Sequence, residues 1–188
     1  WALRDFIRRA REKPYFSNTV FVITADHCAS SAGKTSLPIN HYHIPLWIYS
    51  PANFKPERVH RLMGQLDIPP TLLGMLNFSY RTRFFGHDLF QLPPDREHAF
   101  PGTYEKLGYL HGDVLTILEP QRKLEQLKPD FATGDATPVQ PIDQSLVDDA
   151  VAYYQVASEQ FKDGKLKHRP EDSTKVEPLP APASSTAL

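Results

Sequence analysis

The chain has 188 residues, a formal net charge of −1 and a single cysteine. This length is sufficient for one domain with a hydrophobic core. The near-neutral charge argues against a nucleic-acid partner, and one cysteine excludes an internal disulfide framework. No apolar run approaches the roughly 20 residues of a membrane span, and no signal peptide is recognisable. Because Trp1 already lies inside a helical pattern, we expect the chain to be a piece of a longer protein.

A first helix is predicted before Pro14, where the helical pattern stops. Its apolar residues recur at the spacing of one helix face: Leu3, Phe6, Ile7 and Ala10. The other faces carry arginines, and these are expected to be solvated rather than to form a phosphate site: Arg4, Arg8, Arg9 and Arg11.

The segment 19–24 is predicted to be a strand buried on both faces of a parallel sheet, because its centre is an unbroken run of β-branched and aromatic residues. Asp26 and His27 follow directly, and the carboxyl ends of strands are where open α/β sheets bind ligands. An oxygen and a nitrogen ligand side by side suit zinc or manganese. The alternative is a helix-capping Asp beside a surface His. Cys28, without a partner motif, is expected to be inert.

Residues 28–42 have loop composition and lead to a second buried strand, 46–49, opened by Pro45. His41 and His43 flank Tyr42 just before that strand. If this segment is extended, alternate side chains point to the same side, so both imidazoles can face one ligand. The sequence therefore predicts a second pair of polar groups at the edge that carries Asp26.

The stretch 59–76 is expected to be mainly helical, with a break near 67–70. Asp67 precedes two prolines and Thr71, which favours an N-cap over a catalytic carboxylate. The remaining histidines considered have no partner spacing and are expected at the surface: His60, His98, His111 and His168.

Beyond residue 98 the pattern changes to apolar runs at 107–110 and 114–118 around His111-Gly112-Asp113, which predicts a hairpin. A Pro-rich connector is followed by a helix that Asp143 can cap and Gly164 can end. We expect four segments: a catalytic-domain portion with an edge hairpin (1–128), the connector (129–142), the helix (143–166) and a disordered Pro-rich tail (167–188).

Four motifs in order resemble the late part of a sulfatase-like catalytic domain in the alkaline phosphatase superfamily. They are Asn18-Thr-Val-Phe-Val-Ile-Thr-Ala-Asp-His27, Ile44-Pro-Leu-Trp-Ile-Tyr-Ser-Pro51, Asp67-Ile-Pro-Pro-Thr-Leu-Leu73 and Phe85-Gly-His-Asp-Leu-Phe90. The implied fold class is α/β: a partial alkaline-phosphatase-like sheet flanked by helices, with a C-terminal antiparallel hairpin and a final helix.

Two later segments, Tyr104 to Asp113 and Ala152 to Ser158, are similar to lipoteichoic-acid-synthase-like phosphoglycerol transferases of bacteria. The match extends from about Trp1 to about Leu166. Those proteins carry membrane helices before an extracytoplasmic catalytic domain. The resemblance thus implies inner-membrane anchoring by an upstream segment absent here, with this part in the periplasm.

For the site, the resemblance implies that Asp26 and His27 bind the catalytic manganese or zinc. A His or Lys in the following loop binds substrate, and His41, His43 and Lys34 are the candidates. The family's nucleophile, a Thr or Ser, and a metal-binding Glu lie in the first half of the domain. No residue here matches the nucleophile's motif, so no catalytic nucleophile is assigned and this chain alone is expected to be inactive.

Three functions are compatible with these features. The first is a metal-dependent phosphoglycerol transferase that acts on glycerophospholipid head groups at the cell envelope. The second is a sulfatase or phosphodiesterase that uses water as the acceptor for sulfate or phosphate esters. The third is a non-catalytic binding domain in which the Asp–His pair is structural.

Overall fold

The structure is a computed structural model that describes residues 1–28 and 36–167. The chain forms two compact units. Unit 1 contains Trp1–His60, Pro101–Gly108 and Asp113–Gln140, and unit 2 contains Arg61–Phe100, Tyr109–Gly112 and Pro141–Leu188. The predicted disordered tail lies outside the described residues from His168 onward.

Unit 1 begins with helix α1, Ala2–Ala10, as the apolar spacing predicts, followed by a 3-10 turn, η1, Phe16–Asn18. Asp5 in the first turn forms ion pairs with Arg8 at 2.8 Å and Arg9 at 2.5 Å, so these arginines are solvated surface residues as expected. The Phe6 ring lies edge-on to Phe21, with centroids 5.8 Å apart. This contact packs the apolar face of α1 against the following strand.

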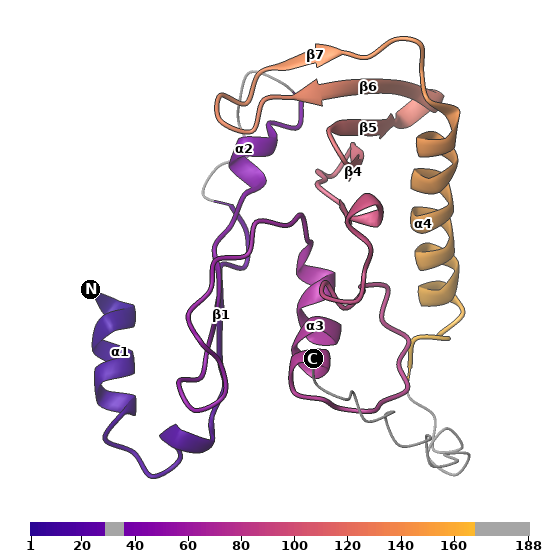
Figure 1. Cartoon of the computed structure of the whole chain (residues 1–188). Coiled ribbons are helices and arrows are strands. Elements are labelled where there is room, and N and C mark those ends of the chain that lie inside the picture. Colours follow the sequence, from indigo (N-terminus) through magenta and orange to yellow (C-terminus); the bar gives the residue numbers. More distant parts are fainter. Residues whose placement is uncertain (29–35, 168–188) are drawn as a thin grey trace, which may run out of the picture. The chain divides into compact units, whose positions relative to one another are not determined.

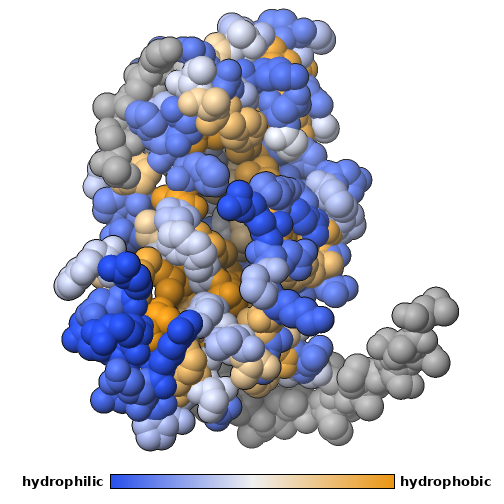
Figure 2. Space-filling model, turned by 60° about the vertical axis from the view of Figure 1, so that its left-hand side comes forward, coloured by the Kyte–Doolittle hydropathy of each residue, from blue (hydrophilic) through white to orange (hydrophobic). Residues whose placement is uncertain are grey.

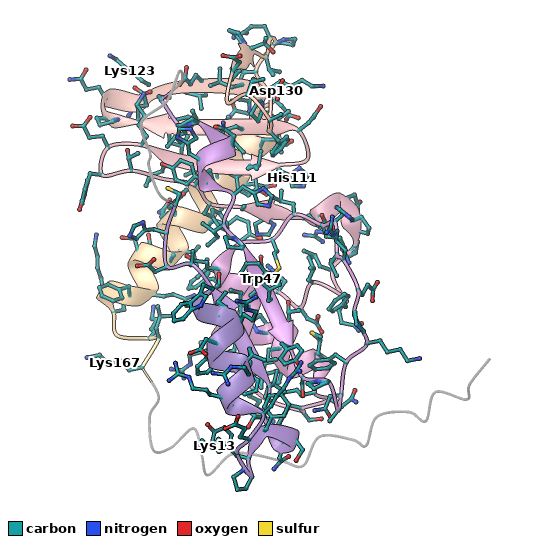
Figure 3. All side chains as sticks on the ribbon, turned by 90° about the vertical axis from the view of Figure 1, so that its left-hand side faces the viewer. Lys13, Trp47, His111, Lys123, Asp130 and Lys167 are labelled. Carbon is teal, nitrogen blue, oxygen red and sulfur yellow. The ribbon has the colours of Figure 1, made fainter. Side chains whose placement is uncertain are left out.

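That strand, β1 (Phe21–Thr24), pairs with β2 (Leu46–Tyr49), and here the structure corrects the sequence prediction. The two strands are antiparallel, with Phe21 opposite Tyr49 and Thr24 opposite Leu46, and they form a two-stranded sheet (Figure 1). Their residues are half-buried or exposed, and Trp47 on β2 is 52% exposed (Figure 3). An apolar run reports burial but carries no information on the direction of the neighbouring strand.

A five-stranded sheet has the order β3-β4-β5-β6-β7. Its strands are β3 (His98–Ala99), β4 (Leu107–His111), β5 (Val114–Glu119), β6 (Lys123–Pro129) and β7 (Ala136–Pro138). The predicted hairpin is confirmed as β4 and β5, and Gly112 in its turn has a φ of +58°. The segment predicted as a connector, 129–142, contains β7, which pairs with β6.

The core of unit 1 lies on β5 and β6, whose inward positions alternate as the pleat requires. Leu115, Ile117 and Leu127 are buried, and Leu37 from the region before β2 is also buried. Between these apolar residues, the Gln126 amide donates to the Thr116 hydroxyl at 3.0 Å, directly across the β5–β6 ladder. A 3-10 turn, η4 (Pro120–Arg122), connects the two strands.

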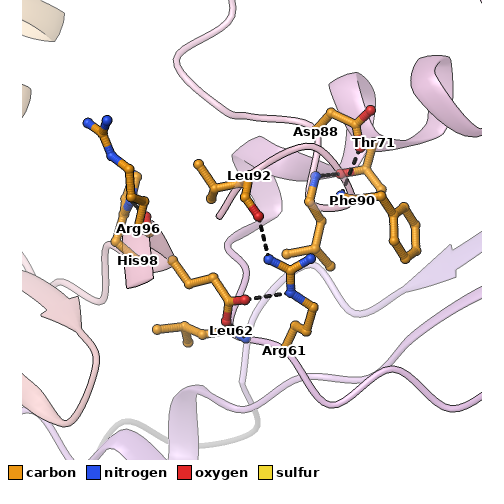
Figure 4. A network of polar contacts seen from close by, with 10 residues as sticks. Arg61, Leu62, Thr71, Asp88, Phe90, Leu92, Arg96 and His98 are labelled. Atoms are coloured by element: carbon orange, nitrogen blue, oxygen red, sulfur yellow. Dashed lines mark hydrogen bonds and ion pairs between the residues drawn. The ribbon is translucent and has the colours of Figure 1, made fainter. Parts of the chain in front are cut away.

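Unit 2 contains η2 (Gln65–Asp67), α3 (Ile68–Met75) and η3 (Pro94–Arg96). The prediction of helix from residue 59 is wrong, because residues 55–64 form no helix. Glu97 accounts for this: it accepts hydrogen bonds from the Leu62 backbone N–H, at 2.8 Å, and from the Arg61 guanidinium. Arg61 also donates to the Leu92 carbonyl at 2.6 Å (Figure 4). Side chains distant in sequence therefore hold this segment in a non-helical conformation.

The last helix, α4 (Gln144–Lys162), is confirmed together with its predicted ends. The Asp143 carboxylate accepts from the Ser145 N–H at 2.9 Å, and Gly164 has a φ of +65°. Val147 and Ala150 are buried, whereas Phe161 is 75% exposed. Within the described residues, no helix has the length and apolarity needed to cross a bilayer. Apolar side chains remain at the surface among hydrophilic ones (Figure 2).

Candidate metal and substrate site

Asp26 and His27 follow the end of β1, as predicted, and both side chains face solvent. The exposed fractions are 88% for Asp26 and 77% for His27. The His27 backbone N–H donates to Asp26 Oδ1 at 3.0 Å, which orients the carboxylate. Short apolar strands place such residues at the end of the ladder, where the side chains have room to accept a ligand.

The ring of His27 is held in one tautomer by its neighbour. Its Nδ1 lies 2.6 Å from the Cys28 carbonyl oxygen, which can only accept a hydrogen bond, so Nδ1 carries the proton. The Nε2 lone pair is then available, and Nε2 lies 3.5 Å from Asp26 Oδ2. A backbone carbonyl on one ring nitrogen is the usual device that directs the other nitrogen to a metal.

The separation of these two atoms fits a shared metal ion. Two ligands at the usual zinc distances and a tetrahedral angle are about 3.4 Å apart, close to the 3.5 Å between His27 Nε2 and Asp26 Oδ2. Catalytic zinc sites generally have three protein ligands. Within residues 1–28 and 36–167 no group of three His, Cys, Asp or Glu residues could hold a metal. The pair can therefore supply two ligands of such a site.

The register of β1 and β2 brings the second predicted pair towards the same end of the sheet. Thr24 lies opposite Leu46, three residues after His43. His41, however, lies on a short helix, α2 (Ile39–Tyr42), so the expected alternation of an extended segment does not apply. His43 is exposed, whereas His41 is half-buried and its Nδ1 is buried without a hydrogen-bond partner. Of the two histidines, only His41 has a buried ring nitrogen without a hydrogen-bond partner.

Tyr42, the last residue of α2, lies near Cys28. Burial raises the pKa of the Tyr42 hydroxyl, and the nearby Cys28 thiol raises it further. The hydroxyl donates to the Gly102 carbonyl at 3.1 Å. The backbone of Cys28, which orients His27, is therefore close to the helix that carries His41. Lys34, the third candidate for substrate binding, lies outside the described residues.

Asp67 is a structural residue, in agreement with the preference for a capping role. It is 7% exposed, and its carboxylate accepts from the Gly64 N–H and the His87 N–H, each at 2.8 Å. The interpretation needs one correction: Asp67 closes η2 and fixes the segment around His87, and its side chain does not cap α3. Two backbone donors occupy the carboxylate, so little of it remains for chemistry.

His98 is the residue that sequence reasoning misplaced. It is 7% exposed, and its ring contacts Phe100, Tyr109 and Tyr153 with centroids 5.2, 5.6 and 4.9 Å apart. Burial lowers the pKa of His98, so the ring is held neutral. The available signal was the aromatic alternation His98–Phe100, typical of one strand face. His60 is exposed as expected, His111 is half-buried, and His168 lies outside the described residues.

Two comparisons with known proteins agree with this architecture. Residues 1–78 match the sulfatase family. The structure is similar to that of a protein in the alkaline phosphatase superfamily from Vibrio parahaemolyticus, with 30% sequence identity and a TM-score of 0.81. That similarity covers 89% of this chain and 41% of the other, so the chain spans less than half of that protein's length. Residues 1–78 therefore have the sequence features of the sulfatase family, and the chain has the fold of the matching part of an alkaline phosphatase superfamily protein.

Proposed function

We propose that this chain is part of a metal-dependent phosphoglycerol transferase, similar to lipoteichoic acid synthases, that acts on glycerophospholipid head groups at the cell envelope. The observation that carries the metal-dependent part is the orientation of His27. The Cys28 carbonyl holds the Nδ1 proton, and Nε2 lies 3.5 Å from Asp26 Oδ2. This oxygen and nitrogen pair suits manganese or zinc. The branch assignment rests on segments 104–113 and 152–158.

The metal held by Asp26 and His27 would lower the pKa of a nucleophilic hydroxyl and neutralise charge on the transferring group. That hydroxyl, a Thr or Ser of the first half of the domain, forms a bond to phosphorus as the bond to diacylglycerol breaks. The departing oxygen would take up a proton, and in this scheme His41 would supply it or bind a phosphate oxygen. An acceptor hydroxyl then displaces the phosphoglycerol group from the enzyme. His43 and Lys34 remain further candidates for contacts with the phosphate.

The proposed location follows from this substrate. A glycerophospholipid head group is presented at a membrane surface, and the similar transferases act on the extracytoplasmic side. We therefore place the chain in the periplasm, joined to the inner membrane by a segment upstream of Trp1.

A second candidate function is hydrolysis of a sulfate or phosphate ester, with water as the acceptor. It is favoured by the sulfatase-family match over residues 1–78, the part that contains Asp26 and His27. The same two ligands and the same nucleophile position serve both reactions, since only the acceptor and the recognised group differ.

The test uses the full-length protein with manganese or zinc and two substrates, phosphatidylglycerol in vesicles and an aryl sulfate. Release of diacylglycerol with transfer of the phosphoglycerol group to an acceptor hydroxyl, lost in Asp26→Ala and retained in Asp95→Ala, supports the transferase, whereas release of free glycerol phosphate selects hydrolysis. Asp95 is a matched exposed carboxylate of unit 2. Cleavage of only the aryl sulfate selects the hydrolase. Metal-independent turnover, or full activity of Asp26→Ala, overturns the proposed site.

A further inference from the structure

Unit 2 contains a cavity of its own, apart from any role of Asp26 and His27. Its volume is about 280 Å³. The polar side chains that line it come from the segment between α3 and η3, from η3, β3, β4 and α4: His87, Arg96, His98, Tyr109, Asp149 and Tyr153. His111, at the end of β4 (Figure 3), is also a lining residue. This volume is below that of drug-sized ligand sites, so the cavity suits a ligand about the size of one small ring.

Aromatic rings form one wall. Tyr109 stacks on Tyr153 with centroids 5.9 Å apart and an interplanar angle of 29°, and on His111 at 5.9 Å and 21°. His98 lies behind them and is 7% exposed. Tyr153 and His111 are half-buried, so part of each ring borders the cavity. Such partly exposed rings present a flat apolar surface together with polar atoms.

Two imidazoles supply polar ring nitrogens. His87 Nδ1 is buried and has no hydrogen-bond partner in the protein. His98 Nδ1 lies 2.9 Å from the Arg96 carbonyl oxygen, so this nitrogen carries the proton and Nε2 is an acceptor. Both imidazole rings line the cavity.

The charged groups of the cavity balance one another. Burial raises the pKa of Tyr109 and of Tyr153, and the nearby Asp149 carboxylate raises both further. Arg96 acts on the same two hydroxyls in the opposite direction. One cation and one anion therefore lie beside the two tyrosine hydroxyls. A phosphate would meet the Asp149 charge and an ammonium group would meet Arg96, so neither ion is favoured.

We propose that this cavity binds a small uncharged polyol, about the size of one sugar ring. The Asp149 carboxylate would accept hydrogen bonds from ligand hydroxyls, Arg96 would donate to them, and the His87 and His98 rings would border the ligand. The face of Tyr153 would cover the apolar side of the ring. Hydroxyl groups both donate and accept, so they match this mixture of groups without adding charge.

The experiment uses the 188-residue chain and follows its histidine ring nitrogens by nitrogen-15 NMR. The probes are glucose, galactose, N-acetylglucosamine and glycerol, with inorganic phosphate and choline as charged comparisons. A ligand of about a dozen heavy atoms is expected to bind with a Kd of about 1–10 mM, from roughly −0.3 kcal/mol per atom. Saturable shifts of the His87 and His98 signals with at least one of the four uncharged probes support the proposal.

Variants on one helix give a matched control. Asp149→Asn is expected to weaken binding at least about tenfold, since a hydrogen bond to a charged group contributes about 1.5–3 kcal/mol. Asp148→Asn, at the adjacent exposed carboxylate that bonds to Gln144, should leave the Kd unchanged. Three outcomes would overturn the proposal. The first is binding of phosphate or choline but of none of the uncharged probes, and the second is an equal effect of the two variants on the Kd. The third is the absence of a saturable shift up to about 100 mM probe, tenfold above the expected Kd. None of these outcomes depends on the proposed transferase activity.

Discussion

Asp26 and Asp67 are both carboxylates close to a histidine, but they lie in opposite environments. Asp26 is 88% exposed and faces His27 Nε2 at 3.5 Å. Asp67 is 7% exposed, and the backbone N–H groups of Gly64 and His87 occupy its two oxygens. The same residue types therefore produce a solvent-exposed pair in unit 1 and a buried structural carboxylate in unit 2.

Because of this difference, we expect Asp67 to contribute mainly to folding stability and Asp26 mainly to ligand binding. A carboxylate saturated by backbone donors lowers the free energy of the folded chain and has few lone pairs left for a ligand. A carboxylate at a strand end that is largely exposed to solvent contributes little to folding but can bind a metal. Variants at the two places should therefore change different measurements.

The largest expected effect concerns activity. In the full-length protein, His41→Ala should lower turnover by roughly 10²–10⁴-fold, the usual range for acid–base assistance, because His41 has the buried open ring nitrogen. His43→Ala, at the exposed neighbour, should have a smaller effect. Steady-state turnover of a phosphodiester measures the effect of each variant, and His60→Ala, at an exposed histidine, is the control. Equal losses for His41 and His43 would restore the original expectation that both rings face one ligand.

The next effect concerns stability. Asp67→Ala removes the buried acceptor of two part-buried N–H groups and should lower the free energy of unfolding by about 2–3 kcal/mol. Asp26→Ala should change it by less than about 0.5 kcal/mol, as for most exposed positions. Urea denaturation of the 188-residue chain compares them. A large loss of stability for Asp26→Ala would show that the exposed pair is structural.

Two glycines test how tightly the backbone packs around Asp67. A Cβ at Gly86 would lie 1.9 Å from the Leu66 carbonyl oxygen, whereas at Gly64 the nearest atom is 3.8 Å away. Gly86→Ala should therefore cost about 3 kcal/mol, because backbone must move. Gly64→Ala should cost less than about 1 kcal/mol. Thermal and urea unfolding measure the difference, and similar values for the two variants would show that the segment 64–67 adjusts freely.

The smallest effect is a dependence of stability on pH. The pKa of His98 is lowered from 6.5 by burial, so the folded state favours the neutral ring. The unfolded chain then binds more protons below pH 6.5, and stability falls as the pH drops from that value through the lower folded pKa. His98→Phe should make the denaturation midpoint less sensitive to pH in this window. An unchanged slope between pH 7.5 and 5.5 would assign the effect to other histidines.

Several features could be predicted because they depend on neighbours in sequence. The spacing of Phe6 and Ile7, the cap at Asp143 and the turn at Gly112 each specify a local conformation, and the structure has all three. Asp26 and His27 were likewise identified from their position after an apolar strand. The family motifs were also visible in the sequence, and the match over residues 1–78 agrees with them.

Other features were decided only when distant residues met. The direction of β2, the non-helical backbone held by Glu97 and the burial of His98 all depend on contacts between segments far apart in the chain. The helical turn at His41 likewise separated it from His43. The sequence by itself determined where helices, turns and reactive side chains occur, because backbone propensity and motif spacing act locally. Tertiary structure alone decided which of those side chains are exposed, satisfied or open, because burial and hydrogen-bond partners are supplied by other parts of the chain.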